Sequence, residues 1–126
     1  MGIANRRLGT RIPLQIFLNE YVADRAFRSM SVNLSPTGIL INRLTTPMVH
    51  QSPILGLEFQ LPGTSDTIWA KGEMRYNAFG EHFSGMGIAF TGIAQGHQRL
   101  IQEYCAVQRA KQLRKILAKI KRNRLH

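Results

Sequence analysis

Short strand-like segments separated by turn residues fill the chain from Ile12 to about Phe90, and this pattern restricts the fold more than any other feature. Apolar and polar residues alternate in PLQIFLNEYV and, more weakly, in AFRSMSVNL, as expected for strands that bury one face. The segments ILIN, SPILGLEFQLP, DTIWAKGEMRYN and HFSGMGIAF continue the series, with turns at Ser35–Gly38 and Pro62-Gly63 and a hairpin across Ala78–Glu81. Six or seven such strands predict a mainly β fold, a small antiparallel barrel or sandwich.

The hydrophobic periodicity changes at Gly92. From Gln95 to about Asn123 there is no proline and, after Gly96, no glycine. Apolar residues recur there at helical spacing: Leu100, Tyr104, Val107, Leu113, Leu117 and Ile120. The sequence therefore predicts one long C-terminal helix, whose first half closes an open end of the barrel and whose second half is longer than a barrel of this size needs.

Positive charge is concentrated at the C-terminus. The chain has 126 residues, enough for one domain, and a net charge of +10. Residues 1–108 carry nine Lys/Arg and all seven Asp/Glu, a balance of +2, whereas residues 109–126 carry eight Lys/Arg and no acid, a balance of +8. We predict three parts: a flexible arginine arm over 1–11, the barrel domain with the start of the helix over 12–107, and a basic amphipathic helical extension over 108–126.

Several classes of protein do not fit the sequence. No apolar run is long enough for a transmembrane helix, and the N-terminus has no secretory signal, so a cytoplasmic location is expected. Cys105 has no second cysteine to pair with, and no Cys/His cluster has zinc-site spacing. The histidines and acids are scattered, and Ser35 lacks a G-x-S-x-G context. We predict no catalytic residue, no metal and no cofactor.

Two short motifs carry the candidate binding chemistry. In RRLGTR, Arg7 and Arg11 stand four residues apart just before a strand. An arginine fork binds phosphate or guanine O6/N7 with two hydrogen bonds and stacks on a base. In NLSPTG, Asn33 and Ser35 stand two apart and can point to one face, while Gly38 permits positive φ or the close approach of a ligand. Alone, the first motif is typical of a solvated terminus and the second of an ordinary turn.

Taken together, the motifs and the strand pattern resemble the PilZ family of bacterial cyclic di-GMP receptors. The family pattern is RxxxR followed 20–30 residues later by [D/N]xSxxG, matched here by Arg7–Arg11 and Asn33–Gly38, and the late strand SGMGIAF is similar to the family's closing strand. The resemblance covers roughly residues 5–105. It implies a six-stranded antiparallel barrel with a C-terminal helix.

The resemblance also implies the site and its action. Arg7 and Arg11 would hold the phosphates and one guanine of cyclic di-GMP, while Asn33, Ser35 and Gly38 would contact the other guanine. An arginine directly ahead of the first motif, here Arg6, is associated in this family with an intercalated pair of ligands. Binding would order the arm and alter partner interactions, with motility, pili, exopolysaccharide, biofilm or virulence as outputs.

Alternatives stay open at this point. A PilZ-fold interaction module without ligand is one, and a nucleic-acid-binding barrel is another. Nucleic-acid binding is not favoured because residues 1–108 carry a net charge of only +2. In addition, the aromatic residues are expected in the core rather than in an exposed row; they are Trp69, Phe59, Phe79 and Phe90. For the basic tail we expect a contact with another helix, in the same chain or a second copy. An acidic partner protein, anionic lipid and a solvated face are the other options.

Overall fold

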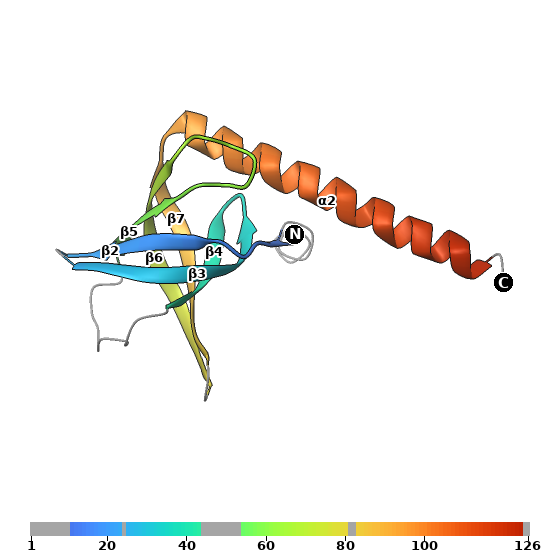
Figure 1. The fold of residues 1–126 in the computed structure, drawn as a ribbon. Coiled ribbons are helices and arrows are strands. Elements are labelled where there is room, and N and C mark those ends of the chain that lie inside the picture. The colour runs from blue at the N-terminus through green and yellow to red at the C-terminus, as the bar shows by residue number, and fades with distance from the viewer. Residues whose placement is uncertain (1–10, 24, 44–53, 81–82, 125–126) are drawn as a thin grey trace, which may run out of the picture.

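The computed structural model describes residues 11–23, 25–43, 54–80 and 83–124, with only the backbone for 76–80 and 83–84. The described residues form seven strands and one helix: β1 (Ile12–Pro13), β2 (Phe17–Val22), β3 (Arg25–Ser35), β4 (Gly38–Arg43), β5 (Ile54–Phe59), β6 (Ile68–Gly80), β7 (Phe83–Ile93) and α2 (Gln95–Arg124) (Figure 1). The predicted hairpin turn is too long. Both strands continue to Gly80↔Phe83, so only residues 81–82, outside the described part, join them.

The strands close into a barrel. Hydrogen-bonded neighbours follow the order β3-β2-β5-β6-β7-β4, and β4 pairs again with β3, every pair being antiparallel. β1 lies outside this ring and pairs only with the end of β3, through Ile12↔Leu34 and Pro13↔Asn33. The prediction of a six-stranded antiparallel barrel with a long C-terminal helix is confirmed. Closure leaves the six ring strands without free edges.

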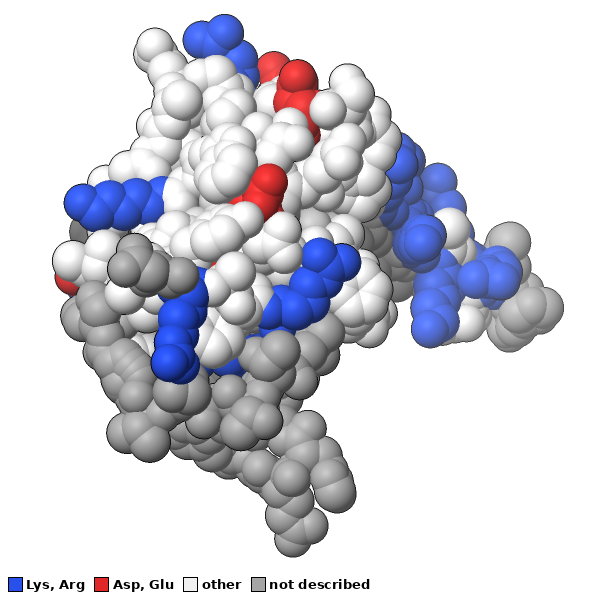
Figure 2. All heavy atoms as spheres, turned by 60° about the vertical axis from the view of Figure 1, so that its left-hand side comes forward, with Lys and Arg blue, Asp and Glu red and all other residues white. Residues whose placement is uncertain are grey.

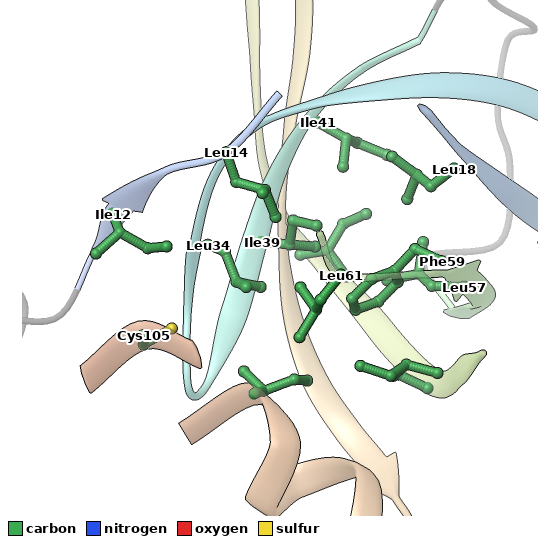
Figure 3. Packing of buried hydrophobic residues seen from close by; sticks show 14 of the residues in the cluster. Ile12, Leu14, Leu18, Leu34, Ile39, Ile41, Leu57, Phe59, Leu61 and Cys105 are labelled. Carbon is green, nitrogen blue, oxygen red and sulfur yellow. The ribbon is translucent and has the colours of Figure 1, made fainter. Parts of the chain in front are cut away.

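The barrel interior is filled with aliphatic side chains, as the alternation predicted. Ile39 and Ile41 of β4, Leu57 of β5 and Ile68 of β6 are all completely buried. At one end α2 contributes Ile101 and Cys105, one helical turn apart, to the same buried cluster as Ile12, Leu14, Leu34 and Leu61. Figure 3 shows Cys105 on the helix at this end. The first half of α2 therefore closes this end of the barrel, and α2 contacts β1 and β3 there.

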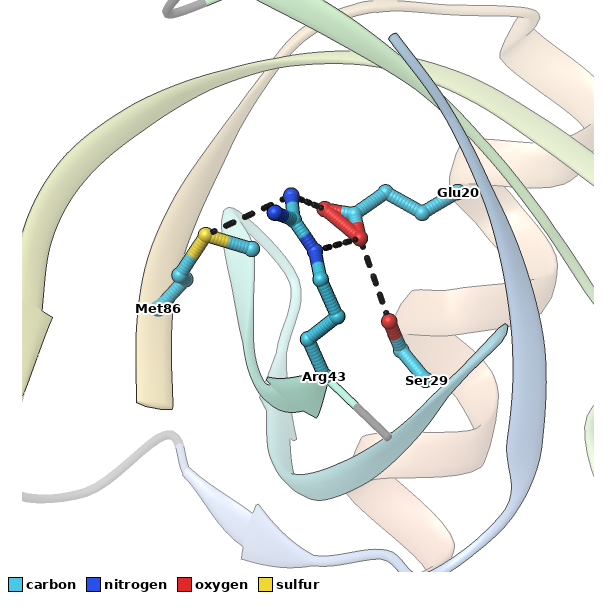
Figure 4. A network of polar contacts seen from close by, with 4 residues as sticks. All are labelled: Glu20, Ser29, Arg43 and Met86. Carbon is cyan, nitrogen blue, oxygen red and sulfur yellow. Dashed lines mark hydrogen bonds and ion pairs between the residues drawn. The ribbon is translucent and has the colours of Figure 1, made fainter. Parts of the chain in front are cut away.

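The other end of the barrel is closed by a buried ion pair between Glu20 and Arg43. β4 runs from Gly38, beside α2, to Arg43 at the far end, where the guanidinium grips the buried carboxylate of Glu20 on β2 (Figure 4). The Nε–Oε1 distance is 2.9 Å and the Nη2–Oε2 distance is 2.6 Å. Ser29 donates to Glu20 at 3.1 Å, and the Arg43 guanidinium lies 4.6 Å from the Phe27 ring centre. Both carboxylate oxygens thus have hydrogen-bond donors, which a buried carboxylate requires.

Beyond the barrel, α2 continues as one uninterrupted helix to Arg124, about 45 Å long at about 1.5 Å per residue. Figure 1 shows its second half projecting away from the strands. Leu113, Ile116, Leu117 and Ile120 are each about half exposed. The contact with another helix of the same chain, one of the options for the tail, does not occur within the described residues.

Candidate ligand-binding site

A bulge in β3 decides which way the second motif faces. Before it, Ser29 and Ser31 point inward and are buried; after it, Leu34 is buried, as is Ser35 at the turn. The register shift lies between Ser31 and Asn33. Side chains alternate between the two faces of a strand, so Asn33 would point into the core if the strand were regular. The extra residue of the bulge turns Asn33 to the outer surface instead.

Ser31 stabilises this irregularity with its side chain. Its hydroxyl accepts a hydrogen bond from the Ile16 backbone N–H at 3.0 Å and donates to the Leu14 carbonyl. The backbone N–H of Leu14 donates to Val32 O at 3.1 Å, and that of Ser31 to Ile16 O at 2.9 Å. The segment between β1 and β2 is thus held to β3 partly through a side chain, which is why the single strand predicted over PLQIFLNEYV divides into two.

Arg11, the last residue of the first motif, reaches the second motif. Its Nη1 donates to Asn33 Oδ1 at 2.6 Å, across 22 residues of sequence. β1, which follows Arg11 directly, pairs with β3 at Asn33 and fixes where the arginine begins. The other two predicted arginines, Arg6 and Arg7, lie outside the described residues. Both Arg11 and Asn33 keep solvent access, Arg11 being exposed and Asn33 half-buried.

Ser35 and Gly38 shape the turn between β3 and β4. The Ser35 hydroxyl accepts from the Gly38 N–H at 3.1 Å and from the Thr37 N–H at 3.3 Å, and the side chain is almost completely buried. A Cβ on Gly38 would stand 2.5 Å from Ile88 O of β7, so glycine is required by the close approach of two strands. The positive φ considered for Gly38 is not observed; among the described glycines it occurs at Gly63.

The turn also touches α2. Gln98 Nε2 donates to Pro36 O at 3.0 Å, and the Phe90 N–H donates to Thr37 O at 2.9 Å. The motif segment is therefore held between β7 and the first turns of the helix. A change in this turn has a direct physical route to α2.

The PilZ domain family model matches residues 5–107, which include both motifs and the whole barrel. The chain belongs to the PilZ domain family. No curated protein matches it in sequence. Among solved structures, the PilZ fold is shared with the Bacillus subtilis inhibitor of motility MotI/DgrA, with a TM-score of 0.69, 23% identity, and coverage of 84% of this chain and 50% of that one.

The PilZ domain of Escherichia coli YcgR, solved with c-di-GMP, gives a TM-score of 0.63 at 14% identity, covering 84% of this chain and 93% of that one. The longer YcgR chain, solved in complex with c-di-GMP, gives a TM-score of 0.60 at 13% identity, covering 87% of this chain and 48% of that one. The present PilZ chain thus spans about half the length of MotI and of the longer YcgR chain. At these identities the likeness establishes the fold.

One ordered cluster on the PilZ barrel was not predicted. Tyr21 OH donates to Glu58 Oε1 at 2.6 Å and Asn19 Nδ2 donates to the same oxygen at 3.1 Å. The hydrogen bond to Glu58 raises the pKa of Tyr21, and the bond from Tyr21 lowers the pKa of Glu58. Trp69 stacks on Tyr21 with ring centres 6.0 Å apart and is 51% exposed, so its predicted core position is wrong.

Strand alternation explains the error at Trp69. It pairs with Glu58, which faces outward together with Asn19, so Trp69 must also face outward. Phe59 is buried as expected, Phe90 is half-buried, and the side chain of Phe79 lies outside the described residues. Among the described residues no three His, Cys, Asp or Glu side chains gather at metal-binding distance, and α2 is not apolar enough to cross a membrane.

Proposed function

We propose that this PilZ domain is a non-catalytic receptor that binds cyclic di-GMP with the arginine arm and the β3–β4 turn. The observation that carries the proposal is the 2.6 Å hydrogen bond from Arg11 to Asn33, which joins the two motifs on the barrel surface. A cyclic dinucleotide presents phosphates and guanine edges together. Fork-shaped cations next to a side-chain amide match both of these groups.

Each residue has a distinct part in the proposed site. Arg7 and Arg11 bind phosphate and guanine, and Arg11 gives up its bond to Asn33 when the ligand enters. Asn33 is then free to pair with a guanine edge. Ser35 and Gly38 act mainly by holding the turn, since the Ser35 hydroxyl is engaged by backbone N–H groups and Gly38 packs against β7. Arg6 adds a cation that favours an intercalated pair of ligands.

Signal output is proposed to follow from ordering of the arm, which covers one surface and changes what a partner contacts. Motility is one candidate process, because MotI is an inhibitor of motility; pili, exopolysaccharide, biofilm and virulence are others. We place the receptor in the cytoplasm, a reducing compartment compatible with the unpaired thiol of Cys105.

Calorimetric titration with cyclic di-GMP tests the proposal. Arg11→Ala should weaken binding by about tenfold to a hundredfold, since a hydrogen bond to a charged group contributes about 1.5–3 kcal/mol. Arg7→Ala should act alike. Arg6→Ala should lower the stoichiometry from two ligands to one.

Arg75→Ala is the matched control, because this exposed arginine pairs with Glu73 at the surface and lies on β6, three strands from β3 around the barrel. It should bind like the wild type. Full-strength binding by both Arg7→Ala and Arg11→Ala would refute the site. Absence of binding by a folded wild-type protein would favour the ligand-free interaction module.

A further inference from the structure

The distal half of α2 (residues 109–124) presents an apolar face that the barrel does not cover. Leu113, Ile116, Leu117 and Ile120 are exposed by 51%, 53%, 57% and 48%. At about 100° per residue these four side chains share one face of the helix. That face lies about a quarter of a turn from the direction of Ile101 and Cys105, the two buried helix residues. It is therefore not a continuation of the barrel-facing surface.

All the charged side chains of the distal half are basic. Residues 109–126 contain eight Lys/Arg and no Asp or Glu. Figure 2 shows these blue side chains gathered along the projecting helix, whereas the barrel shows both signs of charge. The ion pairs Arg43–Glu20 and Arg75–Glu73 both belong to the barrel. Among the residues that the structure describes, no acidic side chain pairs with the distal half, so its positive charge is available to an outside partner. The basic residues are Arg109, Lys111, Arg114, Lys115, Lys119, Lys121, Arg122 and Arg124.

Charge and apolar surface together select the partner. A second copy would cover the apolar face but would bring eight further cations alongside, with no acid to offset them. Nucleic acid would neutralise the cations but would leave the four aliphatic side chains in water. A helical groove of a partner protein would use only the cations that flank the apolar face. An anionic bilayer surface takes up the aliphatic side chains and attracts all eight cations, because its potential extends about a Debye length.

We propose that the distal half of α2 binds the surface of anionic lipid membranes, independently of the ligand site. The helix lies in the plane of the interface with Leu113, Ile116, Leu117 and Ile120 inserted. Arg114 and Lys121 border the apolar face on the side away from the barrel and extend their aliphatic stems along it, which places their charges at the phosphate level. Because the barrel-facing side lies a quarter of a turn away, the barrel rests beside the helix rather than between it and the lipid.

Vesicle flotation with the full chain tests this docking. The wild type should float with vesicles of phosphatidylglycerol mixed with phosphatidylcholine but not with phosphatidylcholine alone, and added salt should reduce the bound fraction. Leu113→Ser/Leu117→Ser should lower the vesicle partition coefficient at least about tenfold, since it removes inserted apolar area. Arg114→Gln/Lys121→Gln should lower it about tenfold, because each cation near the surface contributes several-fold.

The control variant is Lys71→Gln/Arg75→Gln, which removes the same net charge from exposed positions on β6. It should keep the wild-type partition within about twofold. Failure to float with phosphatidylglycerol vesicles would overturn the proposal, as would flotation that survives the two leucine substitutions. A dimer found by light scattering without lipid, and converted to monomer by those substitutions, would assign the face to a second copy instead.

Discussion

At one end of the barrel the core is closed by apolar side chains of α2, whereas at the other end it is closed by the ion pair of Glu20 and Arg43. The two closures respond differently to change. Apolar burial contributes in proportion to area, so small truncations have small effects. A buried ion pair depends on both partners, because removing one leaves an uncompensated charge out of water. The end closed by α2 therefore tolerates small changes in packing at a small cost in stability. It is also the end that carries the candidate ligand site.

The largest effect is expected for Glu20→Ala. The substitution leaves Arg43, whose side chain is only 11% exposed, without its carboxylate. The free energy of unfolding should fall by about 3–5 kcal/mol, measured by urea denaturation. The double variant Glu20→Leu/Arg43→Met removes both charges and should recover most of the loss. A double variant as unstable as Glu20→Ala would mean that the pair itself, rather than the unpaired charge, determines stability at this end.

Gly38→Ala should have the next largest effect. The added Cβ would meet the Ile88 carbonyl oxygen at 2.5 Å, and backbone cannot move aside as a flexible side chain can. We expect a loss of about 1–3 kcal/mol in unfolding free energy. Gly96→Ala, at the start of α2, is the control because a methyl group added there would have nothing within 4 Å; it should be neutral or slightly stabilising. Equal stability of the two variants would contradict the close approach of β4 and β7.

Ile101→Val tests whether the end of the barrel closed by α2 loses only a little stability when a buried side chain is shortened. Removing one methylene from this completely buried side chain should cost about 0.5–1.5 kcal/mol in thermal or urea unfolding. Ile116→Val makes the same change on the exposed face of α2, where the effect should stay within about 0.5 kcal/mol. Similar losses for both variants would show that the distal half is packed in solution.

At neutral pH the ionisation of Cys105 should have no effect on stability, and its effect appears only at alkaline pH. Burial raises the pKa of this thiol from 9.0 to about 11. The folded state therefore keeps its proton where the unfolded state has released it, so stability falls as pH rises through this range. Relative to Cys105→Ala, the wild type should show no pH-dependent difference at neutral pH and a growing loss between pH 9 and about 11. A difference that stays constant over that range would place the thiol in water.

The sequence predicted the barrel because alternation of single residues is a local signal. Leu18, Ile39 and Leu57 are inside as the pattern required. The bulge at Ser31 was not predictable, since it depends on a hydroxyl that bonds a segment 15 and more residues away. The same holds for Glu20 and Arg43, which lie 23 residues apart and look like ordinary surface charges until the barrel closes.

The candidate site could be predicted from the sequence for a different reason. The family resemblance assigns Arg11 and Asn33 to one ligand site, and no property of either segment alone requires them to meet. The contact exists because β1 pairs with the bulged end of β3. The outward position of Trp69 follows from register with Glu58, which the sequence does not specify.

The hydrogen bond from Gln98 to Pro36 has a mechanical consequence. It joins the motif turn to the first turns of α2, a helix about 45 Å long whose far portion projects away from the strands (Figure 1). A tilt of about 5° at those first turns would swing the far tip by about 4 Å, the scale of a side chain. A rearrangement of the motif turn too small to disturb the strands would in this way produce a larger displacement at the C-terminal end of α2.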